Sequence, residues 1–569
     1  MKYYSSVLFI SFSVLLLSWL FNLPQSVGID VPQGKLNSLS YAPFREGQSP
    51  MDGKFPSKQE IEQDLHLLSK QTHSIRTYAS AEGTMPEIPA LARKYGLTMI
   101  QGAWLGGIKK GNELEINELI RSANANPDVV KRVIVGNEVL LRGDLKPEAL
   151  IEYIRAVKRE VKQPVSYADV WSMYMKYPEL IKEVDYITIH ILPYWEDEPI
   201  AVEVAPKHIE KIYQHVQKEA ESIAPNKPIL IGESGWPSAG KQRGWAVPSV
   251  INEAKFIRGL IQVANANQFD YNIVEAINQP WKSELEGVVG ANWGLLSVDR
   301  EQVFPLTGLV YEDPDWLINI APALVIFLLL AVAMRQALYP LPDWQAVLWL
   351  VLVQVLLVAW VKQSQFLWVT SYSDWQRGFA VLVSLISLAM AAVALYRSYQ
   401  VLTGAAVNAE LAKYFQSMYL LAIGFAIYKT LCLAINGRYI SYPTVTYLLL
   451  VGGMLSLMLC TWVAAKVEHK QRWRLLNLTA LTGFASTKPE QQKLLGYCLL
   501  ATVLALIVGE TWAFFISRDL VADYPNTINR LGLALIFTLT NSQLLLWVAS
   551  IAVLSTPLVL LEAKQGKLK

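Results

Sequence analysis

The sequence predicts a chain of two parts, an α/β barrel of the (β/α)8 type followed by an all-α polytopic transmembrane helical domain. Three observations predict this. Strand-like and helix-like stretches alternate in the first half, eight strand-like runs can be counted there, and the second half is a series of long apolar segments. Hydrophobic residues make up 53% of the 569 residues and charged residues only 17%, which is unusual for a wholly soluble protein.

The chain opens with an apolar stretch within residues 1–22, in which Lys2 precedes a long hydrophobic run. Such a segment is either a cleaved signal peptide or an uncleaved signal anchor. No clear cleavage site of small residues follows it, which favours the anchor. We therefore assign residues 1–27 to an N-terminal signal anchor that forms a transmembrane helix.

Eight strand-like runs lie between residues 36 and 277, separated by helix-like stretches. Several of these stretches open with Ser or Pro, as helix starts do. The alternation over roughly 250 residues is typical of a (β/α)8 barrel, which we assign to residues 28–313. The predicted strands are residues 36–44, 74–79, 98–104, 130–138, 164–170, 185–192, 228–233 and 271–277.

Beyond Trp316 the chain consists of apolar segments of about twenty residues, the length that spans a bilayer. We assign residues 314–569 to a transmembrane domain of about seven helices. The basic residues of 466–493 and of the C-terminal tail face the cytoplasm by the positive-inside rule, which places the barrel outside it. The predicted spans are residues 316–336, 344–361, 378–396, 414–435, 444–465, 494–516 and 531–553.

Two ionisable residues, Lys429 and Glu510, interrupt these spans at similar depth and are candidates for an ion pair within the bundle. A pair that packs helices and a proton or ion path are both consistent with the sequence. A polar run at residues 538–543 has the same two interpretations, as contacts between helices or as the lining of a cavity.

A buried-strand run ends on a carboxylate in the stretch P-I-L-I-G-E-S-G-W-P-S, residues 228–238. A lone Glu after a strand is usually a surface residue, but active sites of (β/α)8 barrels lie at the C-terminal ends of the strands. Glu233 ends the seventh predicted strand, and Asn137 and Glu138 end the fourth. Two carboxylates facing each other across the barrel mouth can catalyse glycoside hydrolysis with retention when they stand about 5 Å apart.

No other catalytic group competes with this pair. The six histidines show no metal-ligand spacing, and His190, which lies on a predicted strand, is interpreted as a polar lining or core residue rather than a ligand. The sequence therefore predicts no metal and no cofactor. The net charge of +2 gives no electrostatic reason to expect a nucleic-acid partner.

Residues 36–310 resemble glycoside hydrolase family 17, a β-1,3-glucan-acting family of (β/α)8 barrels. The motifs that carry the resemblance are I-R-T-Y-A-S at strand two, V-G-N-E at strand four, G-E-S-G-W-P-S at strand seven and E-A-I-N-Q-P-W-K at strand eight, with W-G-L after it. The resemblance implies that Glu138 is the acid/base and Glu233 the nucleophile.

Around these two glutamates we expect a shell of polar and aromatic residues that binds the sugar. Asn137 is placed to bond the sugar 2-hydroxyl, and aromatic faces stack on glucose rings. Further aromatic residues near the strand ends, among them Trp104, Trp171, Trp195 and Trp293, favour a cleft for several sugars. The predicted substrate-binding residues are Tyr41, Arg76, Tyr78, Asn137, Tyr194, Trp236, Trp281, Lys282 and Glu286.

The transmembrane segments are a departure from the plant and fungal members of the family, and the likeness is closer to bacterial membrane-bound members. It implies a retaining enzyme in a bacterial inner membrane, with the barrel on the periplasmic side and the bilayer and a β-glucan as partners. Transfer to a glucan acceptor is favoured over mainly hydrolytic action. The helical domain would dock a membrane glucan synthase or simply anchor the enzyme.

Two other classes of protein remain as alternatives. A synthase that uses nucleotide sugars would need a large cytoplasmic domain with a metal site, and the longest predicted cytoplasmic loop, residues 466–493, is too short for one. A non-catalytic glucan-binding or export protein would not need two glutamates at matching strand ends.

Overall fold

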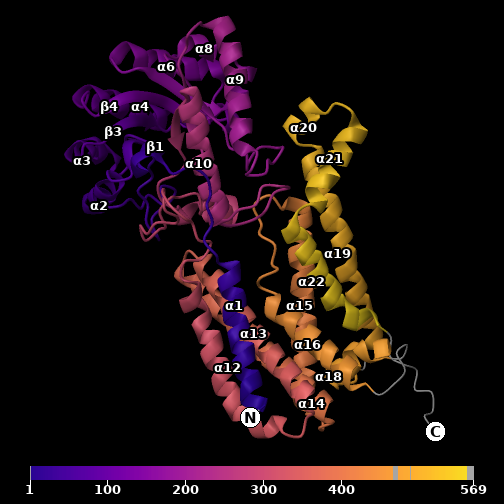
Figure 1. Ribbon diagram of the computed structural model, residues 1–569. Coiled ribbons are helices and arrows are strands. Elements are labelled where there is room, and N and C mark those ends of the chain that lie inside the picture. The colour runs from indigo at the N-terminus through magenta and orange to yellow at the C-terminus, as the bar shows by residue number, and fades with distance from the viewer. Residues whose placement is uncertain (1, 466–471, 487, 561–569) are drawn as a thin grey trace. The chain divides into compact units, whose positions relative to one another are not determined.

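The computed structural model describes residues 2–465, 472–486 and 488–560 (Figure 1). The chain divides into two compact units. One is the continuous segment Pro24–Glu312, and the other combines the residues up to Leu23 with those from Asp313 onward. The two units are described separately below as the barrel and the helical unit.

Eight parallel strands form a closed barrel in the order of the sequence, and β8 pairs with β1 to complete it. The predicted (β/α)8 barrel is therefore confirmed, and each predicted strand is present. The strands are β1 (Leu36–Ser40), β2 (Thr72–Arg76), β3 (Thr98–Ala103), β4 (Val130–Asn137), β5 (Val165–Val170), β6 (Ile187–His190), β7 (Ile229–Ser234) and β8 (Asp270–Ile273).

Helices connect successive strands and cover the outside of the barrel. In α6, Leu150, Ile154 and Val157 recur at helical spacing and are fully buried, because this face packs on the sheet. The helices of this unit are α2 (Lys58–Leu68), α3 (Ile88–Lys94), α4 (Lys109–Ala125), α5 (Val139–Arg142), α6 (Pro147–Glu160), α7 (Trp171–Lys176), α8 (Leu180–Glu183), α9 (Ala205–Ile223), α10 (Val250–Asn267) and α11 (Ser283–Gly290).

A layer of side chains fills the barrel interior, as the closed geometry requires. It consists of Ile100, Ile134, Ala168, Tyr186 and Leu230, all buried. Between the register shifts, which include one before His190 on β6 and one after Ile231 on β7, interior residues alternate with residues that pack against the outer helices. The position of a residue in this alternation therefore shows which side of the wall it faces.

The two ends of the barrel segment lie side by side. Gln25 and Val310 form an antiparallel bridge, with N–H to O distances of 2.8 and 3.0 Å. Arg258 of α10 donates to Asp30 and to the carbonyls of Pro305 and Gly308, at 2.9 to 3.0 Å. The buried guanidinium thus fastens the incoming and outgoing chain to one helix.

Among its described residues, the helical unit contains seven helices that are long and apolar enough to cross a membrane, namely α1, α12, α13, α14, α15, α19 and α22. Its helices are α1 (Lys2–Phe21), α12 (Trp316–Leu338), α13 (Asp343–Val369), α14 (Asp374–Thr403), α15 (Ala409–Asn436), α16 (Leu448–Ala464), α18 (Leu478–Thr482), α19 (Pro489–Phe515), α20 (Arg518–Asp523), α21 (Thr527–Leu539) and α22 (Ser542–Val559).

The last predicted span, residues 531–553, is not one helix. It is divided between α21 and α22, because Asn541 has an extended backbone and its side chain accepts hydrogen bonds from the N–H groups of Gln543 and Leu544, both at 3.1 Å. The polar run at residues 538–543 therefore contains a helix cap.

Lys429 and Glu510 do not form an ion pair among the described residues. The Lys429 side chain is exposed on the surface of α15, whereas Glu510 of α19 accepts a hydrogen bond from the Tyr442 hydroxyl at 3.2 Å. Part of the basic loop used to predict orientation, residues 466–471, and the tail, residues 561–569, lie outside the described residues.

Candidate active site

Glu138 stands directly after β4, in a backbone conformation that aims it at the barrel mouth. Its φ of 52° and ψ of 28° are left-handed, and Gly136 before it has φ 87°. Such a conformation is uncommon for a residue with a Cβ atom and is frequently found at functional sites. The Glu138 N–H donates to the carbonyl of Ala168 on β5 at 2.8 Å, which holds the turn in place.

Glu233 lies within β7 and is buried beside a cation. Arg76, the last residue of β2, donates from Nη1 to Glu233 Oε1 and to the Gly232 carbonyl, both at 2.9 Å. Burial raises the pKa of Glu233, but His190, Arg76 and Lys282, with a hydrogen bond from Tyr78, outweigh it. The pKa of Glu233 therefore lies below its ordinary value, and the side chain is ionised at neutral pH.

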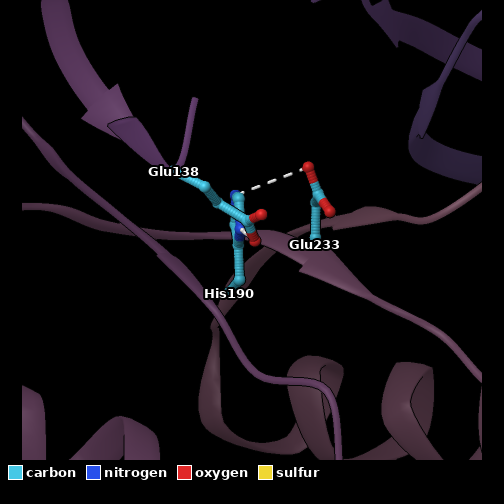
Figure 2. A group of neighbouring side chains, drawn as sticks. All are labelled: Glu138, His190 and Glu233. Carbon is cyan, nitrogen blue, oxygen red and sulfur yellow. Dashed lines mark hydrogen bonds and ion pairs between the residues drawn. The ribbon is translucent and has the colours of Figure 1, made fainter. Parts of the chain in front are cut away.

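His190, the last residue of β6, lies between the two glutamates (Figure 2). Its Nδ1 is 2.8 Å from Glu138 Oε1 and its Nε2 is 3.5 Å from Glu233 Oε1. One ligand atom from each of the three residues lies within 4.8 Å of the other two. The two carboxylates therefore meet across a gap of the size that retaining glycosidases use.

Two carboxylates and one imidazole at this spacing would also suit a divalent transition-metal ion. The metal-free site expected from the sequence stays a prediction. The interpretation of His190 as a lining residue did not include its contacts with both glutamates. His190 pairs with Glu233 of the neighbouring strand, and both residues lie at strand ends. This position is the signal that would have predicted the contacts of His190 with the two glutamates.

Arg76, Asn137 and Tyr78 surround the carboxylates as one hydrogen-bonded group. Arg76 Nη2 donates to Asn137 Oδ1 at 2.6 Å, which leaves the Asn137 amide nitrogen as the group free to face a ligand. The Arg76 guanidinium also lies 4.9 Å from the centre of the Tyr78 ring. These three predicted residues are thus brought together with Glu233.

Lys282 lies on the segment after β8 and pairs with a carboxylate that the sequence did not single out. Its Nζ is 3.1 and 2.9 Å from the two carboxylate oxygens of Glu275, which is almost fully buried. Burial raises the pKa of Glu275 to about 7, although Lys282 acts against the rise. The pKa of Glu286 is also raised, mainly by burial.

Asp169 of β5 is a second buried carboxyl near the site. It accepts hydrogen bonds from the Tyr167 hydroxyl and from the N–H groups of Leu141, at 3.3 Å, and Val170, at 2.8 Å. Burial raises its pKa to about 6, and the nearby charge of Glu138 contributes to the rise. Asp169 thus braces α5, the short helix that follows Glu138.

The predicted aromatic residues differ in their access to solvent. Tyr194 and Trp236 are fully buried and meet edge to face, with ring centres 6.0 Å apart, and Tyr41 is buried against Asp64. Trp281 is only partly buried and donates from its ring nitrogen to Gln279 at 2.9 Å. The first three residues are therefore placed to support the site from behind, and Trp281 is placed to contact a ligand.

An eight-stranded barrel with two carboxylates meeting from the ends of β4 and β7 is the arrangement expected of a retaining glycosidase. Comparison with known proteins assigns the family: residues 38–294 match the BtgE/BtgC glycoside hydrolase domain, so the barrel belongs to glycoside hydrolase family 17. The chain is thus an enzyme of the glycoside hydrolase and transglycosylase class.

Several characterised proteins are similar to the barrel. A glucan 1,3-beta-glucosidase of Arthroderma benhamiae is 27% identical over 52% of this chain and 99% of its own length. A glucan 1,3-beta-glucosidase of Schizosaccharomyces pombe is 27% identical over 40% of this chain and 74% of its own. The structure of an active-site mutant of Rhizomucor miehei beta-1,3-glucanosyltransferase with laminaritriose is 28% identical, with a TM-score of 0.41, and covers 47% of this chain and 95% of that one.

Proposed function

We propose that this protein is a membrane-bound, retaining β-1,3-glucan transglycosylase, which cleaves β-glucosidic bonds through a covalent glucosyl-enzyme. The observation that supports the proposal most directly is the approach of Glu138 and Glu233, whose oxygens lie within 4.8 Å of each other. Inverting enzymes need a wider gap of about 6.5 to 9.5 Å to admit a water molecule between carboxylate and sugar.

In the first step Glu233 is the nucleophile, because His190, Arg76 and Lys282 together outweigh the effect of burial and keep its carboxylate ionised. One of its oxygens bonds to the anomeric carbon while the bond from that carbon to the leaving-group oxygen breaks. Glu138 transfers its proton to the leaving-group oxygen. The side-chain oxygen Oδ1 of Asn137 accepts a hydrogen bond from Arg76. The side-chain nitrogen of Asn137 is therefore placed to donate to the sugar 2-hydroxyl.

In the second step Glu138, now a carboxylate, takes the proton of an incoming hydroxyl. The oxygen of that hydroxyl bonds to the anomeric carbon, and the ester bond to Glu233 breaks. A sugar hydroxyl gives transfer, and water gives hydrolysis. His190 Nδ1, 2.8 Å from Glu138 Oε1, holds this carboxyl in position for both steps.

The substrate class follows from the relatives. The two glucosidases act on 1,3-β-glucans by name, and the Rhizomucor miehei structure holds laminaritriose. The partly exposed Trp281 offers an aromatic surface for a glucose ring, backed by Phe44 with ring centres 6.0 Å apart.

The remaining assignments rest on the helical unit. Seven helices that could span a membrane support a membrane-bound enzyme, with an anchor at residues 1–27, a catalytic barrel at 28–313 and a transmembrane domain at 314–569. Placement of the barrel on the periplasmic side of a bacterial inner membrane, and a glucan synthase as partner, remain predictions.

Product analysis with a defined laminari-oligosaccharide tests the proposal. The full chain in detergent should give products longer than the substrate, and mass and linkage analysis identifies them. We expect Glu233→Gln and Glu138→Gln each to lower turnover by about 10³-fold or more, because each removes a group that forms or breaks a bond. Glu219→Gln, on the exposed face of α9, is the matched control and should retain activity.

Azide distinguishes the nucleophile from the acid/base, because this small nucleophile attacks the anomeric carbon without help from a general base. With an activated β-glucoside, Glu138→Ala should yield the β-azide, formed on the covalent intermediate, and Glu233→Ala the α-azide. Turnover of the oligosaccharide by Glu233→Gln, or an α-configured transfer product from the unaltered enzyme, would refute the proposed mechanism.

A further inference from the structure

Trp104 is an exposed aromatic residue directly after β3, at the end of the barrel that carries the glutamates. It is 41% exposed, whereas Tyr194, Trp236 and Trp293 near the same strand ends are buried. An exposed aromatic ring beside a polar site offers a face on which a sugar ring can stack. The proposed function assigns no role to it.

The strand register places Trp104 close to Glu138. In β3, Ile100 belongs to the interior layer and Gly102 is the next interior position, so Trp104 continues the interior face. Ala103 pairs with Val135 of β4. Trp104 therefore follows level with Gly136, two residues before Glu138 on the adjacent strand.

Arg142 backs the Trp104 ring with its guanidinium, 4.5 Å from the ring centre. The guanidinium is itself held: Nη2 donates to the Leu105 carbonyl at 2.9 Å, Nε to Asp144 at 2.7 Å and Nη1 to the Asn137 carbonyl. A cation over one face of an indole stabilises its orientation. The exposed part of the ring is thus the side away from Arg142.

The backbone of Trp104 is fixed as well. Glu115 of α4, only 4% exposed, accepts hydrogen bonds from the N–H groups of Trp104 at 3.0 Å and of Ser80 and Ala81, both at 2.8 Å. One carboxylate therefore joins the segments after β2 and β3. A platform whose ring and backbone are both held loses little conformational entropy when a ligand stacks on it.

We propose that Trp104 is the stacking platform for the first sugars of the acceptor, and that it sets the ratio of transfer to hydrolysis. This inference rests on the proposed function, since it takes Glu138 as the acid/base. The acid/base protonates the leaving-group oxygen and later deprotonates the acceptor hydroxyl, so leaving group and acceptor occupy its side of the site. Trp104, held through Arg142 to the residue preceding Glu138, lies on that side.

The consequence for the ratio of transfer to hydrolysis arises in the second chemical step, because the first step is common to both reactions. An acceptor glucose stacked on Trp104 presents a hydroxyl to the glucosyl-enzyme, which loses its bond to Glu233 as the new glycosidic bond forms and the proton passes to Glu138. Water needs no such platform. Removal of the ring should therefore weaken transfer more than hydrolysis.

The test compares Trp104→Ala, Trp104→Phe and the unaltered full chain, with a fixed laminari-oligosaccharide donor and increasing acceptor concentration. Transfer products and newly released reducing ends are counted separately. For Trp104→Ala we expect the ratio of transfer to hydrolysis to fall about tenfold, which corresponds to about 1.4 kcal/mol. Weaker binding of the leaving group in the first step lowers both reactions alike and cancels in this ratio. Trp104→Phe should recover most of the ratio, because a ring remains.

Leu114→Ala is the matched control, since Leu114 is an exposed apolar residue of α4, at 58% exposure, next to Glu115. It should leave the ratio unchanged. A ratio in Trp104→Ala equal to that of the unaltered enzyme, or an equal loss of both reactions, would overturn this inference and leave the proposed function standing. No glucan turnover by the unaltered chain would overturn the proposed function itself.

Discussion

The barrel and the helical unit bury polar groups of different kinds. In the described part of the helical unit, the buried polar side chains are amides and hydroxyls, and none is charged. The barrel buries charged or titratable side chains in number: Asp64, Arg76, Glu115, Asp169, His190, Glu233, Lys241, Arg243, Glu253, Arg258 and Glu275.

The difference shows where the chemistry resides. A buried charge is costly unless it is paired or hydrogen-bonded, and in the barrel Arg76, His190, Glu233 and Glu275 meet at the C-terminal ends of the strands. The buried amides of the helical unit, such as Gln416 and Gln492, instead join helices, as polar groups between membrane helices do. The comparison assigns catalysis to the barrel and assembly to the helices.

Among substitutions that test the difference between the two units, Arg76→Leu in the barrel should cause the largest loss of activity and stability. This change removes the Arg76 guanidinium from Glu233 and from the side-chain oxygen Oδ1 of Asn137. We expect activity to fall about 10³-fold and the free energy of unfolding to fall by about 3 to 5 kcal/mol. Turnover on a laminari-oligosaccharide and thermal unfolding measure the two effects, and Arg76→Lys, which keeps the charge, should be less damaging.

A smaller, pH-dependent effect is expected from Glu275→Gln. The pKa of Glu275 is about 7, so below pH 6 the side chain is mostly neutral and an amide resembles it. Above pH 8 the ionised carboxylate holds Lys282, which the amide cannot do as strongly. The profile of kcat/KM against pH should match the unaltered enzyme at pH 5 and lie about tenfold lower at pH 8.5. A deficit of equal size at both pH values would contradict this role.

The smallest effect is expected in the helical unit. Gln416 donates to Thr482 at 3.2 Å and accepts from Gln492 at 3.2 Å. Changing both glutamines to Leu removes the bond between them but also takes the Gln416 donor from Thr482 and from the Phe484 carbonyl, 3.1 Å away. We expect the free energy of unfolding to fall by about 1 to 2 kcal/mol. Glucan turnover should be unchanged. Loss of activity in this variant, with the protein still folded, would break the division between the two units.

The sequence was sufficient to predict the eight strands and the meeting of Glu138 and Glu233 at their C-terminal ends. The alternation of β and α elements is a local pattern, and the glutamates stand at the ends of strands whose order fixes their meeting point. Glu275 was missed as part of the site although it lies only seven residues before its partner Lys282, because no helical or strand period marks that spacing. Asp169 was missed because Glu138, whose charge acts on it, follows a different strand.

Burial was harder to predict than position. Tyr194 and Trp236 end or follow strands as expected, but they pack on each other, so their rings are closed to solvent. The break between α21 and α22 was also missed, since the apolar residues around Asn541 fit a continuous span. The cap itself is a local signal, an Asn before a new helical turn.

The barrel is a continuous domain inserted in the chain between α1 and α12, and the bridge between Gln25 and Val310 brings its two ends together. Because the inserted domain begins and ends at adjoining points, α1 and α12 can pack together without the entropic cost of closing a long flexible loop. Evolution could therefore exchange the enzymatic insert for another domain with closely spaced ends while the surrounding helices keep their packing.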